Sequence, residues 1–139
     1  MARIFIDLPP AFNFTTIIPV RITDLNYGGH VGNDTILSII HEARVQYLKS
    51  FGYDEKDLGG VGVIMSDVAI NFRTELFYGD VVSASVAVKD ISRAAFDLVY
   101  LLKKAEVVIA EAKTGMVCFD YNKRKIAALP VEVKQHFEK

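Results

Sequence analysis

Residues 24–34, DLNYGGHVGND, form a short stretch with several side chains that can hold or transfer a proton. The ordinary pKa of histidine lies near neutrality, so His30 can accept a proton from water under working conditions. Asn26 can orient that water or bind a carbonyl oxygen, and the carboxylate of Asp24 can act as a second base. His30, Asn26 and Asp24 are therefore the candidate catalytic residues.

Each of these three residues also has a purely structural interpretation. His30 can cap the loop through a hydrogen bond to the backbone. Asn26 can be a turn residue, since asparagine favours turns and left-handed backbone. Asp24 can close a turn or an ion pair. The neighbouring glycines fit both interpretations, because they permit a tight turn and also the close approach of a ligand.

A helix directly after this stretch must position it. Apolar residues recur at spacings of three and four over residues 34–51 and so share one helix face. Asn33, Asp34 or Thr35 can cap the start of this helix. Gly52 is placed to end it in a left-handed conformation.

Two charged residues of the expected helix lie on different sides. Arg44 points near the apolar face, and burying a guanidinium without a partner is costly. We therefore expect Arg44 to pair with Asp24 or Asp67. Glu42 projects opposite the apolar face, which makes it a solvated or interface residue and only a secondary catalytic candidate.

Segments rich in β-branched and aromatic residues precede and follow the helix. They cover residues 12–25, 61–72, 81–91, 95–104 and 107–121. Pro19 implies an edge position or a bulge, and short connections between the later strands predict hairpins in an antiparallel sheet. Pro130 lies near the start of a short terminal helix. The predicted class is α+β: one long helix wrapped by a curved antiparallel sheet of five to six strands.

Composition narrows the class of protein. The 139 residues suit one domain, residues 1–139, and the net charge of -1 makes nucleic acid an unlikely partner. The single cysteine, Cys118, lies in an apolar run and is expected to pack as a small hydrophobe, which fits a cytoplasmic setting. We expect no signal peptide and no membrane span. Histidine and cysteine show no metal-ligand spacing.

Three motifs in order resemble one known family. They are RITDLNYGGHVGNDTILSIIHEAR, INFRTELFYGDVV and VVIAEAKTGMVCFDYNKRKIAALP, which together span roughly residues 15–135. The whole chain resembles hotdog-fold thioesterases of the 4-hydroxybenzoyl-CoA thioesterase and acyl-carrier-protein thioesterase type. The resemblance implies hydrolysis of an acyl-CoA or acyl-carrier-protein thioester, without a further cofactor, at an active site between the subunits of a homodimer or of a tetramer of dimers.

The family motif also implies which residues act. Backbone N–H groups at the start of the central helix point at the thioester carbonyl, and a nearby carboxylate is the nucleophile or general base. This sequence has Asn26 where many relatives have the catalytic aspartate, and Gly28 where the carrier-protein branch has an asparagine. Either His30 or Asp24 then provides the base, or another carboxylate does so across the dimer.

Residues around the motif and on the following strand are implied as the substrate-binding set. They are Tyr27, Gly28, Gly29, Val31, Asn33, Asp67 and Arg73. Interface packing is the alternative for Tyr27, and an outward-facing strand position is the alternative for Asp67. Cations for the phosphates of coenzyme A are Arg73, Arg93 and the basic turn at residues 123–125.

Two other functions compete with the thioesterase. The order of Asp24, Asn26 and His30 partly resembles a hydratase or dehydratase motif of the same fold, although it has one residue too many and no proline. A non-catalytic acyl-thioester binder is the other alternative, and Asn26 is its best support. Release of a thiol, hydration of a double bond, or binding without turnover would separate the three.

Overall fold

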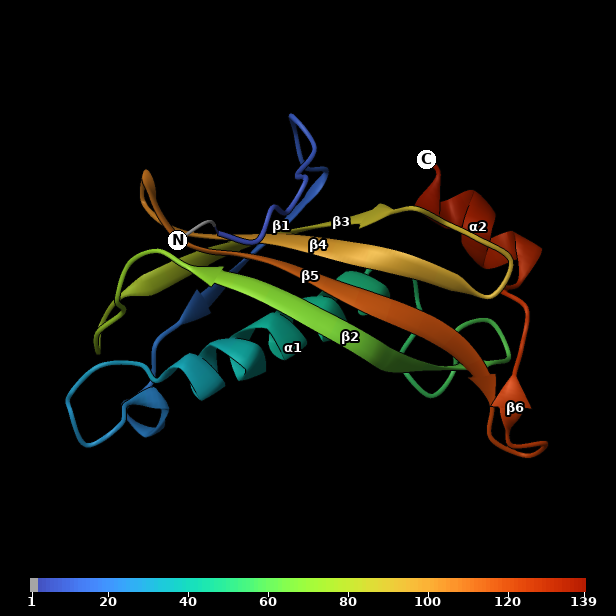
Figure 1. Cartoon of the computed structure of the whole chain (residues 1–139), viewed down its shortest axis with the longest axis horizontal. Helices are drawn as coiled ribbons and strands as arrows, with labels where there is room; N and C mark the ends of the chain where they lie inside the picture. The colour runs from blue at the N-terminus through green and yellow to red at the C-terminus, as the bar shows by residue number, and fades with distance from the viewer. Residues whose placement is uncertain (1–2) are drawn as a thin grey trace.

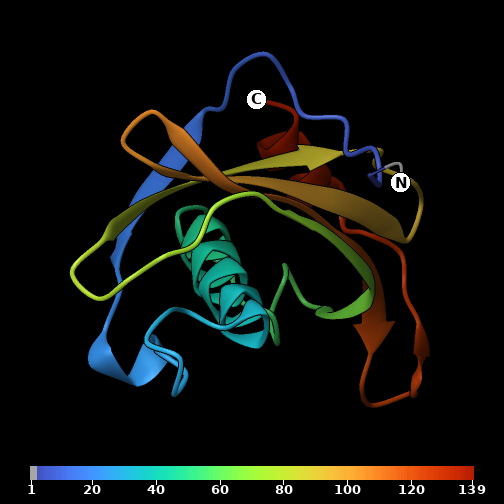
Figure 2. The ribbon, with the colours of Figure 1, turned by 60° about the vertical axis from the view of Figure 1, so that its left-hand side comes forward.

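The computed structural model of the chain describes residues 3–139, in which one antiparallel sheet curves around a long helix (Figures 1 and 2). The elements in chain order are β1 (Phe14–Pro19), the 3-10 helix η1 (Ile22–Asp24), α1 (Asn33–Lys49), β2 (Gly62–Phe72), β3 (Val81–Lys89), β4 (Ala95–Lys104), β5 (Val107–Asp120), β6 (Lys125–Ile126) and α2 (Val131–Phe137). This α+β arrangement confirms the predicted hotdog fold.

The sheet has the strand order β1-β3-β4-β5-β2, with β6 paired to β5. The position of β1 at one edge confirms what Pro19 implies. The predicted hairpin between β2 and β3 is wrong, because β2 pairs with β5 and β3 pairs with β1 and β4. The β2–β3 connection instead crosses past the start of α1, where the N–H of Val31 donates to the carbonyl of Leu76 at 2.9 Å.

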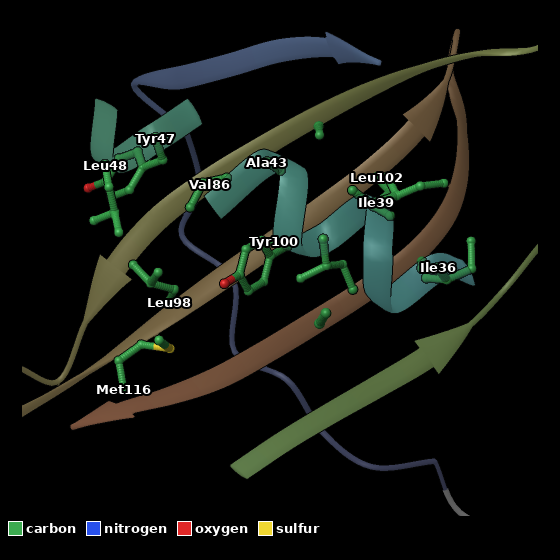
Figure 3. Close-up of a cluster of buried hydrophobic side chains, with 14 of the residues drawn as sticks. Ile36, Ile39, Ala43, Tyr47, Leu48, Val86, Leu98, Tyr100, Leu102 and Met116 are labelled. Carbon is green, nitrogen blue, oxygen red and sulfur yellow. The ribbon is translucent and has the colours of Figure 1, made fainter. Parts of the chain in front are cut away.

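The apolar face of α1 packs against the concave face of the sheet (Figure 3). Buried residues on the helix side are Ile36, Ile39, Ile40, Ala43, Tyr47 and Leu48, and those on the sheet side include Val86, Leu98, Tyr100, Leu102 and Met116. Full burial of one such large apolar side chain contributes roughly 1.5–3 kcal/mol. This contact therefore fixes the axis of α1 and the place to which its N-terminus points.

The two ends of α1 differ in how their backbone groups are satisfied. The expected cap by Asn33, Asp34 or Thr35 is wrong, because Gly32 is the N-cap residue and no side chain bonds to the first turn. At the other end Gly52 adopts a φ of 84°, as predicted. Within residues 3–139, no helix combines the length and apolar character needed to cross a membrane.

The predicted partners of Arg44 are also wrong. Its Nε lies 3.5 Å from an oxygen of Glu55, and its Nη1 donates to the hydroxyl of Tyr100 at 3.3 Å. Tyr100 in turn shares a 2.7 Å hydrogen bond with Thr114, and burial raises the pKa of its hydroxyl. Arg44 lies three turns along α1, so it faces β4 and the loop after the helix.

Cys118 on β5 is fully buried, as predicted, and this burial raises the pKa of its thiol to about 11. Because the thiolate is the reactive form, we expect no reaction with a disulfide reagent such as Ellman's reagent in the folded protein. Unfolding in guanidinium should release one reactive thiol per chain. Stoichiometric labelling under native conditions would contradict this packing of β5.

Candidate active site

A cavity of about 330 Å³ opens at the N-terminus of α1. It lies between the loop before α1, the end of β2 and the start of β5. Its walls are formed by His30, Val31, Asn33, Ile36, Phe72, Arg73, Thr74, Glu75, Leu76 and Ile109. Four residues predicted from the sequence, His30, Val31, Asn33 and Arg73, therefore meet in one place.

The backbone hydrogen bond between Val31 and Leu76 holds the two loops of this cavity together. His30 directly precedes Val31, and Glu75 directly precedes Leu76, so the bond places an imidazole and a carboxylate on facing loops. Glu75 is exposed and makes no hydrogen bond or ion pair through its side chain within residues 3–139. Its carboxylate is therefore free to meet a ligand in the cavity.

The imidazole of His30 is half-buried and held by its own backbone. Its Nδ1 lies 3.2 Å from the carbonyl oxygen of Val31. Since a carbonyl only accepts hydrogen bonds, Nδ1 is the donor in this pair. Nε2 is then the ring nitrogen left to interact with a ligand.

The first turn of α1 offers unused hydrogen-bond donors. The N–H groups of Thr35 and Ile36 donate to the carbonyl of Gly32. Those of Asn33 and Asp34 precede them and have no side-chain cap. An uncapped helix start carries free N–H donors and about half a positive charge, which suits an oxygen that becomes negative during a reaction.

The turn from Asn26 to His30 shapes the rim of the cavity. The Oδ1 of Asn26 accepts a hydrogen bond from the N–H of Gly28 at 2.8 Å, the asparagine turn expected as one alternative. Gly29 has a φ of 84°, a left-handed conformation that favours glycine. Tyr27 is fully exposed and touches no cavity wall. Asn26, Tyr27, Gly28 and Gly29 thus lie outside the cavity lining.

Asp24 is a capping residue in this structure. Its side chain is nearly buried, and Oδ2 accepts a hydrogen bond from the N–H of Arg21 at 2.8 Å, while the Arg21 guanidinium lies 3.4 Å from Oδ1. Asp24 lines a separate groove between β1 and α1, where Glu42 also lies and accepts from Gln46. Neither carboxylate lines the cavity at the helix start.

Asp67 and Arg73, two further predicted site residues, each form a hydrogen bond with another side chain. Asp67 accepts hydrogen bonds from Lys113 at 2.8 Å and from the N–H of Gly115 at 2.9 Å, and the Lys113 bond holds its pKa below the usual range. Lys113 alternates along β5 with buried residues, so Asp67 lies on the sheet face opposite α1. Arg73 lines the cavity and donates to Glu111 at 2.7 Å.

Glu75 lines the cavity but is not among the site residues predicted from the sequence. Its segment, TELFYGD, forms part of the second family motif, but the glutamate alone resembles any exposed acid on a loop. A carboxylate from across a dimer was one alternative expected from the sequence. The crossover that replaces the expected hairpin brings a carboxylate of the same chain to the cavity wall.

Comparisons with known proteins agree on one family. The sequence profile of the thioesterase-like superfamily matches residues 20–137. A 1,4-dihydroxy-2-naphthoyl-CoA hydrolase of Microcystis aeruginosa is 33% identical over 118 residues, which cover 83% of this chain and 86% of that protein. The Nostoc punctiforme enzyme of the same name is 31% identical over 129 residues, covering 91% and 87%.

A solved structure extends this agreement to three dimensions. The 1,4-dihydroxy-2-naphthoyl-CoA thioesterase from Synechocystis superposes with a TM-score of 0.78 at 26% sequence identity. The match covers 88% of this chain and 92% of the other. The fold and the family are therefore shared over nearly the whole length of both chains.

Substitution of Asp24 by alanine removes the carboxylate that caps η1. We expect the free energy of unfolding to fall by about 1 kcal/mol, the usual effect of losing a helix cap. Asp24→Ser should retain most of the stability, because the serine hydroxyl can still accept from Arg21. Chemical denaturation of both variants measures this, and equal stability of wild type and Asp24→Ala would contradict the capping role.

Proposed function

Since the chain belongs to the thioesterase-like superfamily and is a thioester hydrolase, we propose that it hydrolyses an aromatic acyl-CoA in the cavity at the start of α1. The observation that carries this assignment is the convergence there of His30, Glu75 and an uncapped helix N-terminus. A base, a carboxylate and an oxyanion site are the groups that thioester hydrolysis needs.

Binding of the thioester carbonyl is assigned to the first turn of α1. The carbonyl oxygen accepts hydrogen bonds from the free N–H groups of Asn33 and Asp34 as it becomes negative. These donors are fixed in place by the packing of α1 on the sheet, so little reorganisation accompanies the reaction. Loss of one such donor typically costs about 100–1,000-fold in rate.

Activation of water is assigned to His30, with Glu75 in support. The water oxygen attacks the carbonyl carbon and gives its proton to Nε2 of His30. The carbon–sulfur bond then breaks, and the imidazolium returns the proton to the departing sulfur of coenzyme A. Glu75 stabilises the positive charge on His30 between these steps, which a neutral Asn26 cannot do.

The apolar walls of the cavity support an aromatic acyl group. Its apolar lining comes from the loop before α1 (Val31), from α1 (Ile36), from the end of β2 (Phe72) and from β5 (Ile109). A flat ring buries its faces well against such aliphatic and aromatic side chains. The names of two similar relatives, both 1,4-dihydroxy-2-naphthoyl-CoA hydrolases, support the same class of substrate.

The free edge of the sheet supports a homodimer. β2 is an edge strand, and Met65, Val68 and Phe72 on it are exposed by 40–44%. An exposed apolar edge strand invites pairing with another chain. We propose that two copies pair antiparallel along β2 and share one continuous sheet.

This symmetry would complete the coenzyme A site. The start of β2 pairs with Phe119, next to the β5–β6 hairpin that carries the basic turn. In an antiparallel pair, that hairpin of one subunit lies near the end of β2 in the other. Lys123, Arg124 and Lys125 of the partner subunit would then face the phosphates of a substrate whose thioester lies beside His30.

Substitution of either proposed group should lower kcat. We expect His30→Ala to reduce kcat at least about 100-fold, because it removes the group that transfers the proton, and Glu75→Gln at least about 10-fold, because it removes the charge that stabilises the imidazolium. Thiol release from an aromatic acyl-CoA such as 4-hydroxybenzoyl-CoA measures both. Asp24→Ser is the matched control and should retain turnover, since Asp24 lies outside the cavity.

Unchanged kcat in both His30→Ala and Glu75→Gln would overturn the assignment of the site. Tight binding of the acyl-CoA by wild type without thiol release would instead identify a binding protein, and hydration of an enoyl-CoA would identify a hydratase.

A charge placed on the free edge should separate the subunits. We expect Val68→Asp to halve the mass in solution, because two like charges would meet across the paired β2 strands. Turnover should fall with it if the partner supplies the phosphate contacts. Val107→Asp, at a similarly exposed valine outside β2, is the control. Light scattering measures the mass, and an unchanged mass for Val68→Asp would place the interface elsewhere.

A further inference from the structure

A larger cavity, of about 590 Å³, lies at the opposite end of α1 from the candidate active site. It is bordered by the N-terminal segment, the last turn of α1, the end of β3 and α2. In Figure 1 this end of the molecule carries α2 and the C-terminus, far from the start of α1. Tyr47 lies fourteen positions after Asn33 along α1, or roughly 21 Å at the helical rise. No β2 residue lines this cavity.

Aromatic rings form the inner wall of this cavity. Tyr47 packs edge-on against Phe14 at 5.4 Å and against Phe51 at 5.1 Å between ring centroids. Phe137 of α2 stacks on Tyr47 at 6.1 Å, and His136 stacks on Phe51 at 6.2 Å. A wall of rings at these spacings accepts another flat ring by stacking or edge contact.

A tyrosine hydroxyl in this wall has no hydrogen-bond partner within residues 3–139. The ring of Tyr47 is largely buried, with 6% of the residue exposed, whereas its hydroxyl is not among the fully buried unpaired polar atoms and so retains an exposed surface. Burial raises the pKa of this hydroxyl to about 12, so it remains a donor at all ordinary pH values. An accessible hydroxyl of this kind can donate a hydrogen bond to a bound acceptor.

The charges around the cavity favour an anion. Among the described residues, no aspartate or glutamate lines it, whereas His136 of α2 and Lys139, two residues after the end of α2, do. His136 is held by a 2.6 Å hydrogen bond between its Nδ1 and the hydroxyl of Tyr53, which leaves Nε2 available. Asn13 and Ser50 add polar groups to the lining. Apolar walls with a few convergent polar groups are typical of small-molecule sites.

We propose that this cavity is a second binding site that takes a small aromatic carboxylate, with its ring against Phe51 and Phe137 and its carboxylate near Lys139. The hydroxyl of Tyr47 donates to a polar atom of the ligand. The site is separate from the catalytic cavity, and its occupancy does not depend on the proposed thioesterase activity.

Calorimetric measurement of the affinity of the full chain for 2-naphthoate tests the proposal. We expect Tyr47→Phe to weaken binding by about 3–10-fold, the effect of one neutral hydrogen bond. Lys139→Gln should also weaken binding of 2-naphthoate, and by more at low salt than at high salt. The matched controls are Tyr121→Phe and Lys134→Gln, which change exposed residues outside the cavity and should bind as wild type does.

A second measurement separates this cavity from the active site. In a His30→Ala background 2-naphthoate should still bind, and Tyr47→Phe should still weaken that binding. Loss of binding with His30→Ala and none with Tyr47→Phe would overturn the proposal, because the ligand would then occupy the catalytic cavity. Equal affinity for decanoate would overturn the selectivity for an aromatic ring. Neither result depends on whether thioesters are hydrolysed.

Discussion

One backbone hydrogen bond, from the N–H of Val31 to the carbonyl of Leu76, determines how the candidate active site is assembled. It joins the loop before α1 to the crossover between β2 and β3. Without it, His30 and Glu75 would belong to two independent loops, and the cavity between them would have no fixed width. Because both bonded groups are backbone atoms, the contact constrains position without specifying the side chains on either side.

The packing of α1 on the sheet provides the second constraint. The helix axis is fixed by apolar contacts along its whole length, so the free N–H groups of its first turn point at a fixed place. Preorganised donors of this kind act on a developing charge without reorganising during the reaction. The same rigidity extends to the last turn of α1, where Tyr47 and Phe51 form the wall of the second cavity.

Much of the fold was predictable from the sequence, because these features depend on hydrophobic periodicity and on local chemistry. The span of α1, the left-handed Gly52, the edge position of β1 and the burial of Cys118 all follow from such signals. The partner of Arg44 and the crossover after β2 depend instead on which distant segments meet. Glu75 was missed for the same reason, since only the crossover carries it to His30. The geometry places Asp24 and Asp67 elsewhere, in a turn and on the outer face of the sheet.

At the uncapped start of α1, a substitution of Gly32 that would stabilise the helix would also impair the proposed function. Serine or aspartate at position 32 would ordinarily strengthen a helix by supplying the missing cap. Here a side chain at Gly32 would lie 2.6 Å from an oxygen of Asp34 and would occupy the donors proposed for the substrate. Efforts to raise the thermal stability of this enzyme would therefore gain more from surface positions than from this obvious weak point in the helix.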